Sequence, residues 1–172
     1  MEKLKGYSLH IRAMFDKKEL KLLKELIIDS RQRITELAKK CGLTRQSVYE
    51  KMSEFKLKGI RFTIDVKPQD LGLNLIAYIL VVADPHKAFR EETDKLIKKF
   101  REISQIHYIL GRFDVIAEVM VKDIEEFRDV LTRVQGLPAV RKTETLIVYE
   151  STKQDRLDPL LRALEKELER KE

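Results

Sequence analysis

The residues best suited to recognising another molecule stand at the start of a predicted helix that runs from Thr44 to about Lys58. Arg45 and Gln46 lie near the beginning of this helix, on the side away from its apolar stripe. An Arg side chain pairs well with guanine, and a Gln side chain with adenine, in the major groove of DNA. Three further positions face outward: Tyr49, Glu50 and Ser53. This arrangement predicts a helix that reads the edges of bases.

Polar and basic groups around this helix are expected to contact the DNA backbone. Thr44 and Ser47, at the helix N-terminus, are interpreted as phosphate-binding or capping groups. Non-specific attraction to phosphates is expected from five basic residues: Arg31, Arg33, Lys39, Lys40 and Lys51. Each Lys taken singly is explained more simply as part of an ordinary solvated surface.

The positive charge of the chain is concentrated in its first third. The 172 residues hold 35 Lys and Arg against 29 Asp and Glu, a net charge of +6. Residues 1–66 carry 16 basic and 9 acidic side chains, whereas residues 67–150 carry 13 and 14. Residues 151–172 carry six of each. This imbalance predicts an anionic partner that touches one domain only.

Three predicted helices hold the basic region together. The first starts at Asp16, which has Glu19 at the spacing of a capping box. Ala38 on the second helix is small enough for a close helix crossing, and Gly42 after it suits a tight turn. Val48 faces back from the third helix. This spacing predicts a helix-turn-helix, although similar helical triplets occur in proteins that do not bind DNA.

The hydrophobic pattern changes after Leu73. The predicted elements are a strand at 75–83, a helix at 84–100, strands at 106–110 and 115–121, a helix from 123, and a strand at 140–149. This β-α-β-β-α-β order is ferredoxin-like. The fold class is therefore α+β, with a helix-turn-helix domain followed by a ferredoxin-like domain and a C-terminal helix.

Four segments follow from this pattern. We expect an N-terminal arm over residues 1–15 and a winged-helix-like helix-turn-helix domain over residues 16–66, with a short strand or wing at 60–66. The ferredoxin-like domain spans residues 67–150. Residues 151–172 are predicted to form an amphipathic helix that Asp158 caps.

Several other protein classes are disfavoured by composition. The single cysteine, Cys41, excludes an internal disulfide framework and is interpreted as a small buried side chain. The three scattered histidines have no metal-ligand spacing, so neither a metal nor a cofactor is expected. The longest apolar run, Leu75–Ala83, is too short to span a bilayer, and the N-terminus lacks the apolar stretch of a signal peptide. A cytoplasmic protein with no membrane partner is expected.

Short motifs in this chain follow the order of a known family. The first half contains Phe15-Asp16-Lys17-Lys18-Glu19, Ile34-Thr35-Glu36-Leu37-Ala38, Gly42-Leu43-Thr44 and Gly59-Ile60. The second half contains Asp70-Leu71-Gly72, Gly111-Arg112-Phe113-Asp114 and Val140-x-x-Thr143-x-Thr145. Over residues 15–150 the sequence thus resembles the Lrp/AsnC family, the leucine-responsive or feast/famine transcription factors. Phe113 stands where that family usually has Tyr, and residues 1–14 and 151–172 are additional.

The resemblance implies a sequence-specific DNA-binding regulator that responds to a small effector, typically an amino acid. It implies dimers that pair sheet against sheet and assemble into rings, often octamers, with the effector bound between dimers. The residues carried over to the effector site are Gly111, Arg112, Phe113 and Asp114, facing Gln135, Gly136, Leu137 and Pro138, together with Thr143 and Thr145.

Several of these residues also have simpler interpretations. Thr143 and Thr145 alternate by two and so project from one face, but Thr is in any case a common strand residue. Asp114 is interpreted as a partner for a ligand ammonium group or as a turn-stabilising Asx residue. Arg112 is interpreted as a partner for a ligand carboxylate or for a surface carboxylate such as Glu118.

The strand Leu75–Ala83 is apolar on both faces. One helix-covered face of a small domain needs only half of those apolar side chains. We therefore expect self-association through the open face of the sheet.

Two other functions remain in view. The sirohaem decarboxylases are similar to this family in both domains, and His107 or Tyr108 with Arg101 and Arg112 would then serve an active site. The segment 59–62 lacks the Arg-rich, glycine-ended stretch of those enzymes, and few groups converge, so no enzyme is expected. An amino-acid sensor that does not bind DNA is disfavoured by the charge of residues 1–66.

Overall fold

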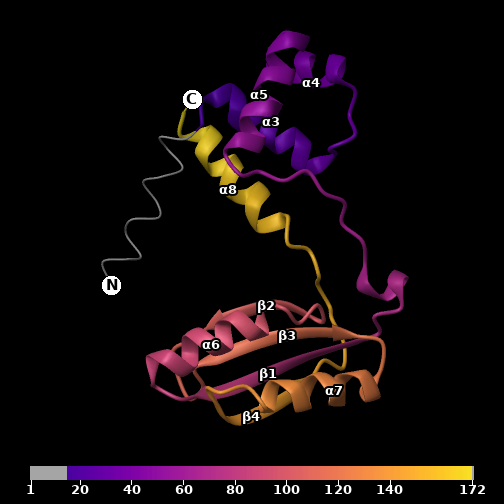
Figure 1. Cartoon of the computed structure of the whole chain (residues 1–172). Coiled ribbons are helices and arrows are strands. Elements are labelled where there is room, and N and C mark those ends of the chain that lie inside the picture. The colour runs from indigo at the N-terminus through magenta and orange to yellow at the C-terminus, as the bar shows by residue number, and fades with distance from the viewer. Residues whose placement is uncertain (1–14, 172) are drawn as a thin grey trace. The chain divides into compact units, whose positions relative to one another are not determined.

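The computed structural model describes residues 15–171. The chain divides into two compact units, one formed by the residues up to 64 together with those from 153 onward, and the other by residues 65–152 (Figure 1). The expected N-terminal arm lies outside the described residues except for Phe15. The C-terminal segment thus belongs to the same unit as the helix-turn-helix.

Among its described residues the first unit contains four helices: α3 (Lys17–Ile28), α4 (Ile34–Cys41), α5 (Arg45–Leu57) and α8 (Asp158–Glu169). The predicted capping box of α3 is confirmed. The Asp16 carboxylate accepts a hydrogen bond from the Glu19 amide at 2.7 Å, and the Glu19 carboxylate accepts one from the Asp16 amide at 2.6 Å. Gly42 ends α4 with a left-handed φ of 63°, which a side chain would disfavour.

An apolar cluster joins α3, α4 and α5. Its buried members are Leu22, Leu26, Leu37, Ala38, Cys41, Val48 and Phe55. The burial of Ala38 and Val48 agrees with their predicted positions at the helix crossing. Burial also raises the pKa of the Cys41 thiol, as expected for a structural cysteine.

A buried carboxylate ties the start of α3 to the far end of α5. Glu19 is only 6% exposed, and its Oε1 lies 3.0 Å from Lys58 Nζ and 3.7 Å from Lys51 Nζ. Lys51 Nζ also lies 3.0 Å from Asp16 Oδ2. Burial disfavours the charged form of Glu19, but the hydrogen bonds from the Asp16 amide and Lys58 outweigh it, so its pKa is lowered.

The second unit follows the predicted β-α-β-β-α-β order. A short 3₁₀ turn, η1 (Pro68–Leu71), precedes it, and its elements are β1 (Leu75–Ala83), α6 (Lys87–Ile97), β2 (Ile103–Tyr108), β3 (Val115–Val121), α7 (Ile124–Gln135) and β4 (Val140–Ile147). The four strands form one antiparallel sheet in the order β2-β3-β1-β4 (Figure 1). The ferredoxin-like prediction is confirmed.

The sheet has two different faces. One face, with Ala77, Ile79 and Val81 of β1, packs against the helices in a core that includes Phe127 and Val130 of α7. The opposite face carries the alternate residues of β1, which are Ile76, Tyr78, Leu80 and Val82. None of the described helices of this unit contributes to a core on that second face.

The expected strand over residues 60–66 is wrong. Residues 60–67 have no regular secondary structure, and Ile64 is 81% exposed. A strand needs a neighbouring edge to complete its hydrogen bonds, and within the described residues this segment has none.

Several predicted boundaries also need correction. Helix α6 ends at Ile97 rather than at Phe100, and β4 ends at Ile147 rather than at Tyr149. Helix α6 begins at Lys87 rather than at Asp84, because the Asp84 carboxylate accepts hydrogen bonds from His86 and forms a turn there. These hydrogen bonds lower the Asp84 pKa to about 2. Strand β2 lies at Ile103–Tyr108 and not at 106–110. Asp158 does not cap α8 as predicted. The amides of Leu157 and Asp158 donate hydrogen bonds to the Asp155 carboxylate, and the Asp158 side chain pairs with Lys153.

We predict that Glu19→Gln lowers the unfolding free energy of the helical unit by about 1–3 kcal/mol at neutral pH, since Lys51 and Lys58 lose their shared partner. Because the folded pKa of Glu19 is lowered, its stabilisation is present above the unfolded pKa and lost as pH falls through the folded one. Hydrogen exchange of amides in α3 and α5 measures this unit alone.

Glu54→Gln, at an exposed position of α5, serves as the matched control, with an expected change within about 0.5 kcal/mol. Equal stability of the Glu19→Gln and parent proteins at neutral pH would contradict the assignment.

Candidate DNA interface and effector site

Helix α5 presents the predicted base-reading residues on its exposed side. Arg45, Gln46, Tyr49 and Glu50 are all exposed, with Tyr49 at 58%. Gln46 Nε2 donates a hydrogen bond to Glu50 Oε1 at 3.0 Å, so one turn of the helix presents an amide and a carboxylate together. These groups offer donors and acceptors at the end of the helix that enters the groove in a helix-turn-helix.

The two hydroxyl residues at the start of α5 act on each other. Thr44 Oγ1 accepts a hydrogen bond from the Ser47 amide at 3.1 Å, and its oxygen lies 2.9 Å from Ser47 Oγ. Thr44 therefore caps the helix. Both hydroxyls lie beside the helix N-terminus, a favourable place for an anion.

The five basic residues predicted for the DNA backbone fall into two groups. Lys40 Nζ lies 2.7 Å from Glu25 Oε2, and the hydrogen bond to that carboxylate raises its pKa. Lys51 is held by Asp16 and Glu19, and its side chain is only 19% exposed. Arg31, Arg33 and Lys39 form the second group and are exposed; Lys40 is also 51% exposed in spite of its ion pair. A DNA phosphate can therefore contact Arg31, Arg33 or Lys39 without breaking the ion pairs of Lys40 and Lys51.

The predicted effector turn, Gly111–Asp114, connects β2 to β3. Asp114 Oδ2 accepts a hydrogen bond from the Ala83 amide at 2.8 Å, and Asp114 Oδ1 lies 3.9 Å from Arg90. Its carboxylate thus fastens the turn to the end of β1, which is a longer-range role than an Asx turn. The Gln135–Pro138 connection reaches the same end of the sheet, because the Asp84 amide donates to Ala139 O at 2.7 Å.

Arg112 pairs with a different carboxylate from the one suggested by the sequence. Its guanidinium lies 3.5 Å from Glu144 Oε2 and over the ring of Phe113. Glu118 instead accepts a hydrogen bond from Tyr78, its cross-strand neighbour. The Arg112 side chain is 74% exposed, so its ion pair with Glu144 is weak and open to exchange.

Thr143 and Thr145 share one face of β4, as predicted. They pair with Val81 and Ile79, whose side chains point toward the helices. Gln135 Nε2 donates to Thr143 Oγ1 at 2.9 Å, which joins the end of α7 to the strand. Glu144, the partner of Arg112, lies on the opposite face of β4. A single chain therefore does not gather all the predicted effector residues on one surface.

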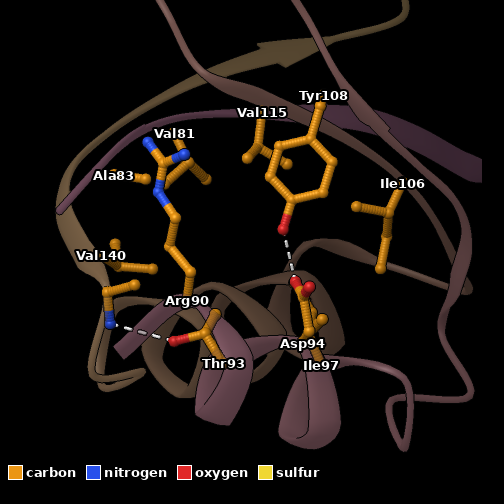
Figure 2. A pocket seen from close by; sticks show the side chains of 11 residues that line it. Val81, Ala83, Arg90, Thr93, Asp94, Ile97, Ile106, Tyr108, Val115 and Val140 are labelled. Atoms are coloured by element: carbon orange, nitrogen blue, oxygen red, sulfur yellow. Dashed lines mark hydrogen bonds between the residues drawn. The ribbon is translucent and has the colours of Figure 1, made fainter. Parts of the chain in front are cut away.

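A small pocket lies under α6, on the helix-covered face of the sheet (Figure 2). Its apolar walls include Val81, Ile97, Ile106, Val115 and Val140. Its polar groups are Arg90, Thr93, Asp94 and Tyr108, and the Tyr108 hydroxyl donates to Asp94 Oδ1 at 2.6 Å. None of the predicted effector residues lines it.

The pocket gives little support to acid catalysis by His107 or Tyr108. Burial and the hydrogen bond to Asp94 raise the pKa of Tyr108 to about 12, which makes it a poor proton donor. His107 projects from the opposite face of β2, where its Nε2 lies 2.9 Å from Gln105 Oε1. The described residues contain no cluster of His, Cys, Asp and Glu able to hold a metal ion. In the same residues no helix is long and apolar enough to cross a membrane.

Comparison with known proteins places the chain among transcriptional regulators. Residues 76–158 match the model of the Lrp/AsnC ligand binding domain. The proline dehydrogenase transcriptional activator of Rhizobium radiobacter is 31% identical over 140 residues, which cover 79% of this chain and 90% of that protein. The HTH-type transcriptional regulator FL11 of Pyrococcus abyssi is 27% identical over 146 residues, covering 84% of this chain and 95% of its own length.

Solved structures have the same arrangement of elements. AsnC of E. coli has a TM-score of 0.74 with 26% identity, covering 84% of this chain and 99% of that one. A transcriptional regulator from Neisseria meningitidis, solved as a complex with L-Met, has a TM-score of 0.75 with 22% identity, covering 85% and 99%. The second likeness concerns the fold alone. Both the sequence and the structural comparisons agree with the predicted resemblance, and the chain belongs to the Lrp/AsnC family of transcriptional regulators.

Proposed function

We propose that this protein binds specific DNA sequences through α5 and changes its DNA binding in response to a small amino acid, acting in the cytoplasm. The observation that carries the proposal is the exposed pair Arg45 and Gln46 at the first turn of α5, directly after the Gly42 turn. The net charge of +7 on residues 1–66 supplies the attraction to DNA.

Within this proposal, base reading and backbone attraction come from different residues. Arg45 and Gln46 discriminate between bases, while Tyr49 and Glu50 line the same surface. Thr44, Ser47, Arg31, Arg33 and Lys39 contact phosphates. Lys40 and Lys51 contribute less, since each must leave a carboxylate partner to do so.

The proposed active form is a dimer made through the open face of the sheet. On this face Leu146 is 50% exposed, and Tyr78, its partner in the register, and Val82 of β1 are half-buried. A second copy would cover these side chains and place two helix-turn-helix units on half-sites about one helical turn of DNA apart.

The proposed effector site lies at the Gly111–Asp114 end of the sheet. Arg112 would bind the carboxylate of an amino acid in place of Glu144, and Asp114 would hold the turn in position. The L-Met complex of the Neisseria meningitidis regulator supports an amino acid as the class of effector. Because Thr143 and Arg112 lie on different faces of one chain, a complete site would draw residues from more than one copy.

The DNA interface is tested by substituting one residue proposed to read bases and one proposed to contact phosphates. Arg45→Ala should weaken binding to a duplex that the parent selects from a random pool by about 1–3 kcal/mol, and should relax the preference for the contacted base. Lys39→Ala should weaken binding to every duplex and flatten the salt dependence.

Lys40→Ala serves as the matched control, because Lys40 already has Glu25 and Gln32 as partners and should change the salt slope less than Lys39→Ala. Filter binding or fluorescence anisotropy at several salt concentrations measures all three. An Arg45→Ala protein with parental affinity at matched salt would show that α5 does not read bases through this residue.

Self-association is tested by light scattering at micromolar concentration, where the parent should be at least a dimer. Leu146→Glu should shift the parent toward monomer, because it introduces a charge on the apolar face. Leu160→Glu, at an equally exposed position on α8, should not. A monomeric parent would exclude the sheet-face dimer.

Effector binding is tested by a thermal-shift and calorimetric screen of the twenty amino acids. At least one should bind the parent, and both Arg112→Gln and Asp114→Ala should weaken it, the first by loss of a charge-assisted hydrogen bond. A parent that binds none of the twenty, or a binder indifferent to both substitutions, would refute this site.

A further inference from the structure

We propose that α8 is a positioning element of the DNA-binding unit, and that residues 148–157 thereby form a second covalent connection between that unit and the ferredoxin-like unit. This inference rests on the proposed function. The family model matches residues 76–158, and α8 covers Asp158–Glu169. The helix thus begins where the shared domain ends.

Polar contacts fasten α8 to α3 at two points. Lys24 Nζ on α3 lies 2.8 Å from Glu165 Oε1 on α8. Beyond the end of α8, Lys171 Nζ donates a hydrogen bond to the Phe15 carbonyl oxygen at 2.6 Å. One contact is in the second half of α3 and the other is just before its first residue, so α8 and the residue after it meet this helix at more than one place (Figure 1).

Apolar burial supports the same arrangement. Leu164 is the buried residue of α8, at 8% exposure. Leu20 of α3 is 1% exposed but is not part of the cluster that α3, α4 and α5 share. Leu20 and Lys24 are four residues apart and therefore lie on one face of α3, the face that meets Glu165. We attribute the burial of Leu20 to α8.

The contact at Phe15 extends to the proposed recognition helix. The Phe15 ring packs edge-on against Phe55 of α5, with ring centroids 5.8 Å apart. Lys58, which follows α5, places Nζ 4.7 Å from the centre of the Phe15 ring. The end of α8 therefore holds a residue that packs directly on α5.

The connectivity of the chain gives this packing a consequence. Residues 65–74 lead from the helix-turn-helix into β1, and residues 148–157 lead from β4 back to α8. A unit joined by one segment turns freely about it, whereas two segments restrict its orientation. In a dimer, such restriction raises the effective concentration of the second unit at the second half-site once the first is bound.

The second connection also starts from a relevant strand. Thr143 and Thr145 of the proposed effector site lie on β4, which continues through residues 148–157 into α8. A change at that strand has a direct covalent route to the DNA-binding unit.

The test compares affinity for two DNA molecules. One is a duplex selected by the parent from a random pool, and the other is the same duplex with one half-site randomised. Leu164→Asp should release α8, and Leu160→Asp, one turn earlier in the same helix at a position that is 52% exposed, is the control. A third variant carries ten Gly and Ser residues inserted between Glu150 and Ser151, which leaves α8 docked and slackens only the second connection.

Leu164→Asp and the insertion should each lower affinity for the paired site by roughly tenfold or more, while changing affinity for the single half-site less than twofold. Leu160→Asp should behave as the parent. Hydrogen exchange should show α3 deprotected in Leu164→Asp and protected in the insertion variant.

Unchanged affinity for the paired site in both variants would overturn the proposal. So would an equal loss on both duplexes, because α8 would then only stabilise the fold of its unit. A parent that selects no duplex at all refutes the proposed function instead, so the two failures are distinguishable.

Discussion

The geometry of the DNA-binding unit depends on the carboxylate of Glu19. This side chain closes the capping box of α3 and, from the same position, accepts hydrogen bonds that reach α5 through Lys58. A carboxylate this deeply buried is costly unless both of its oxygens have partners, and here the Asp16 amide and Lys58 provide them. The register between the first helix and the proposed recognition helix is therefore set by a polar contact as well as by the apolar cluster.

That constraint has a consequence for the interface with DNA. Lys51 and Lys58 are positive residues on or beside α5, yet both are oriented toward the start of α3. The electrostatic contribution to DNA binding is left to cations outside this network, such as Arg31, Arg33 and Lys39. Counting basic residues along the sequence overstates the charge that faces the DNA, because part of it stabilises the protein itself.

Local signals in the sequence were sufficient to predict most of the fold. Capping at Asp16 and Thr44, the turn at Gly42 and the apolar run of β1 depend on residues a few positions apart, and each is confirmed. The predicted strand over residues 60–66 failed because a strand also requires a neighbour, which no local pattern specifies. The Lys40–Glu25 and Arg112–Glu144 pairs, 15 and 32 residues apart, likewise depend on tertiary contacts.

In the candidate effector site, too, the sequence predicted local geometry but not tertiary contacts. The alternation of Thr143 and Thr145 correctly placed both on one face of β4, but only the sheet register reveals that this face is turned toward the helices. Arg112 reaches Glu144 on the other face. Backbone alternation points Glu144 away from the two threonines on β4, so Arg112 in its pair with Glu144 is directed to the face opposite to theirs. The effector site proposed from the family resemblance would therefore draw residues from more than one copy, and under that proposal assembly would be a condition for effector binding rather than a separate property of the protein.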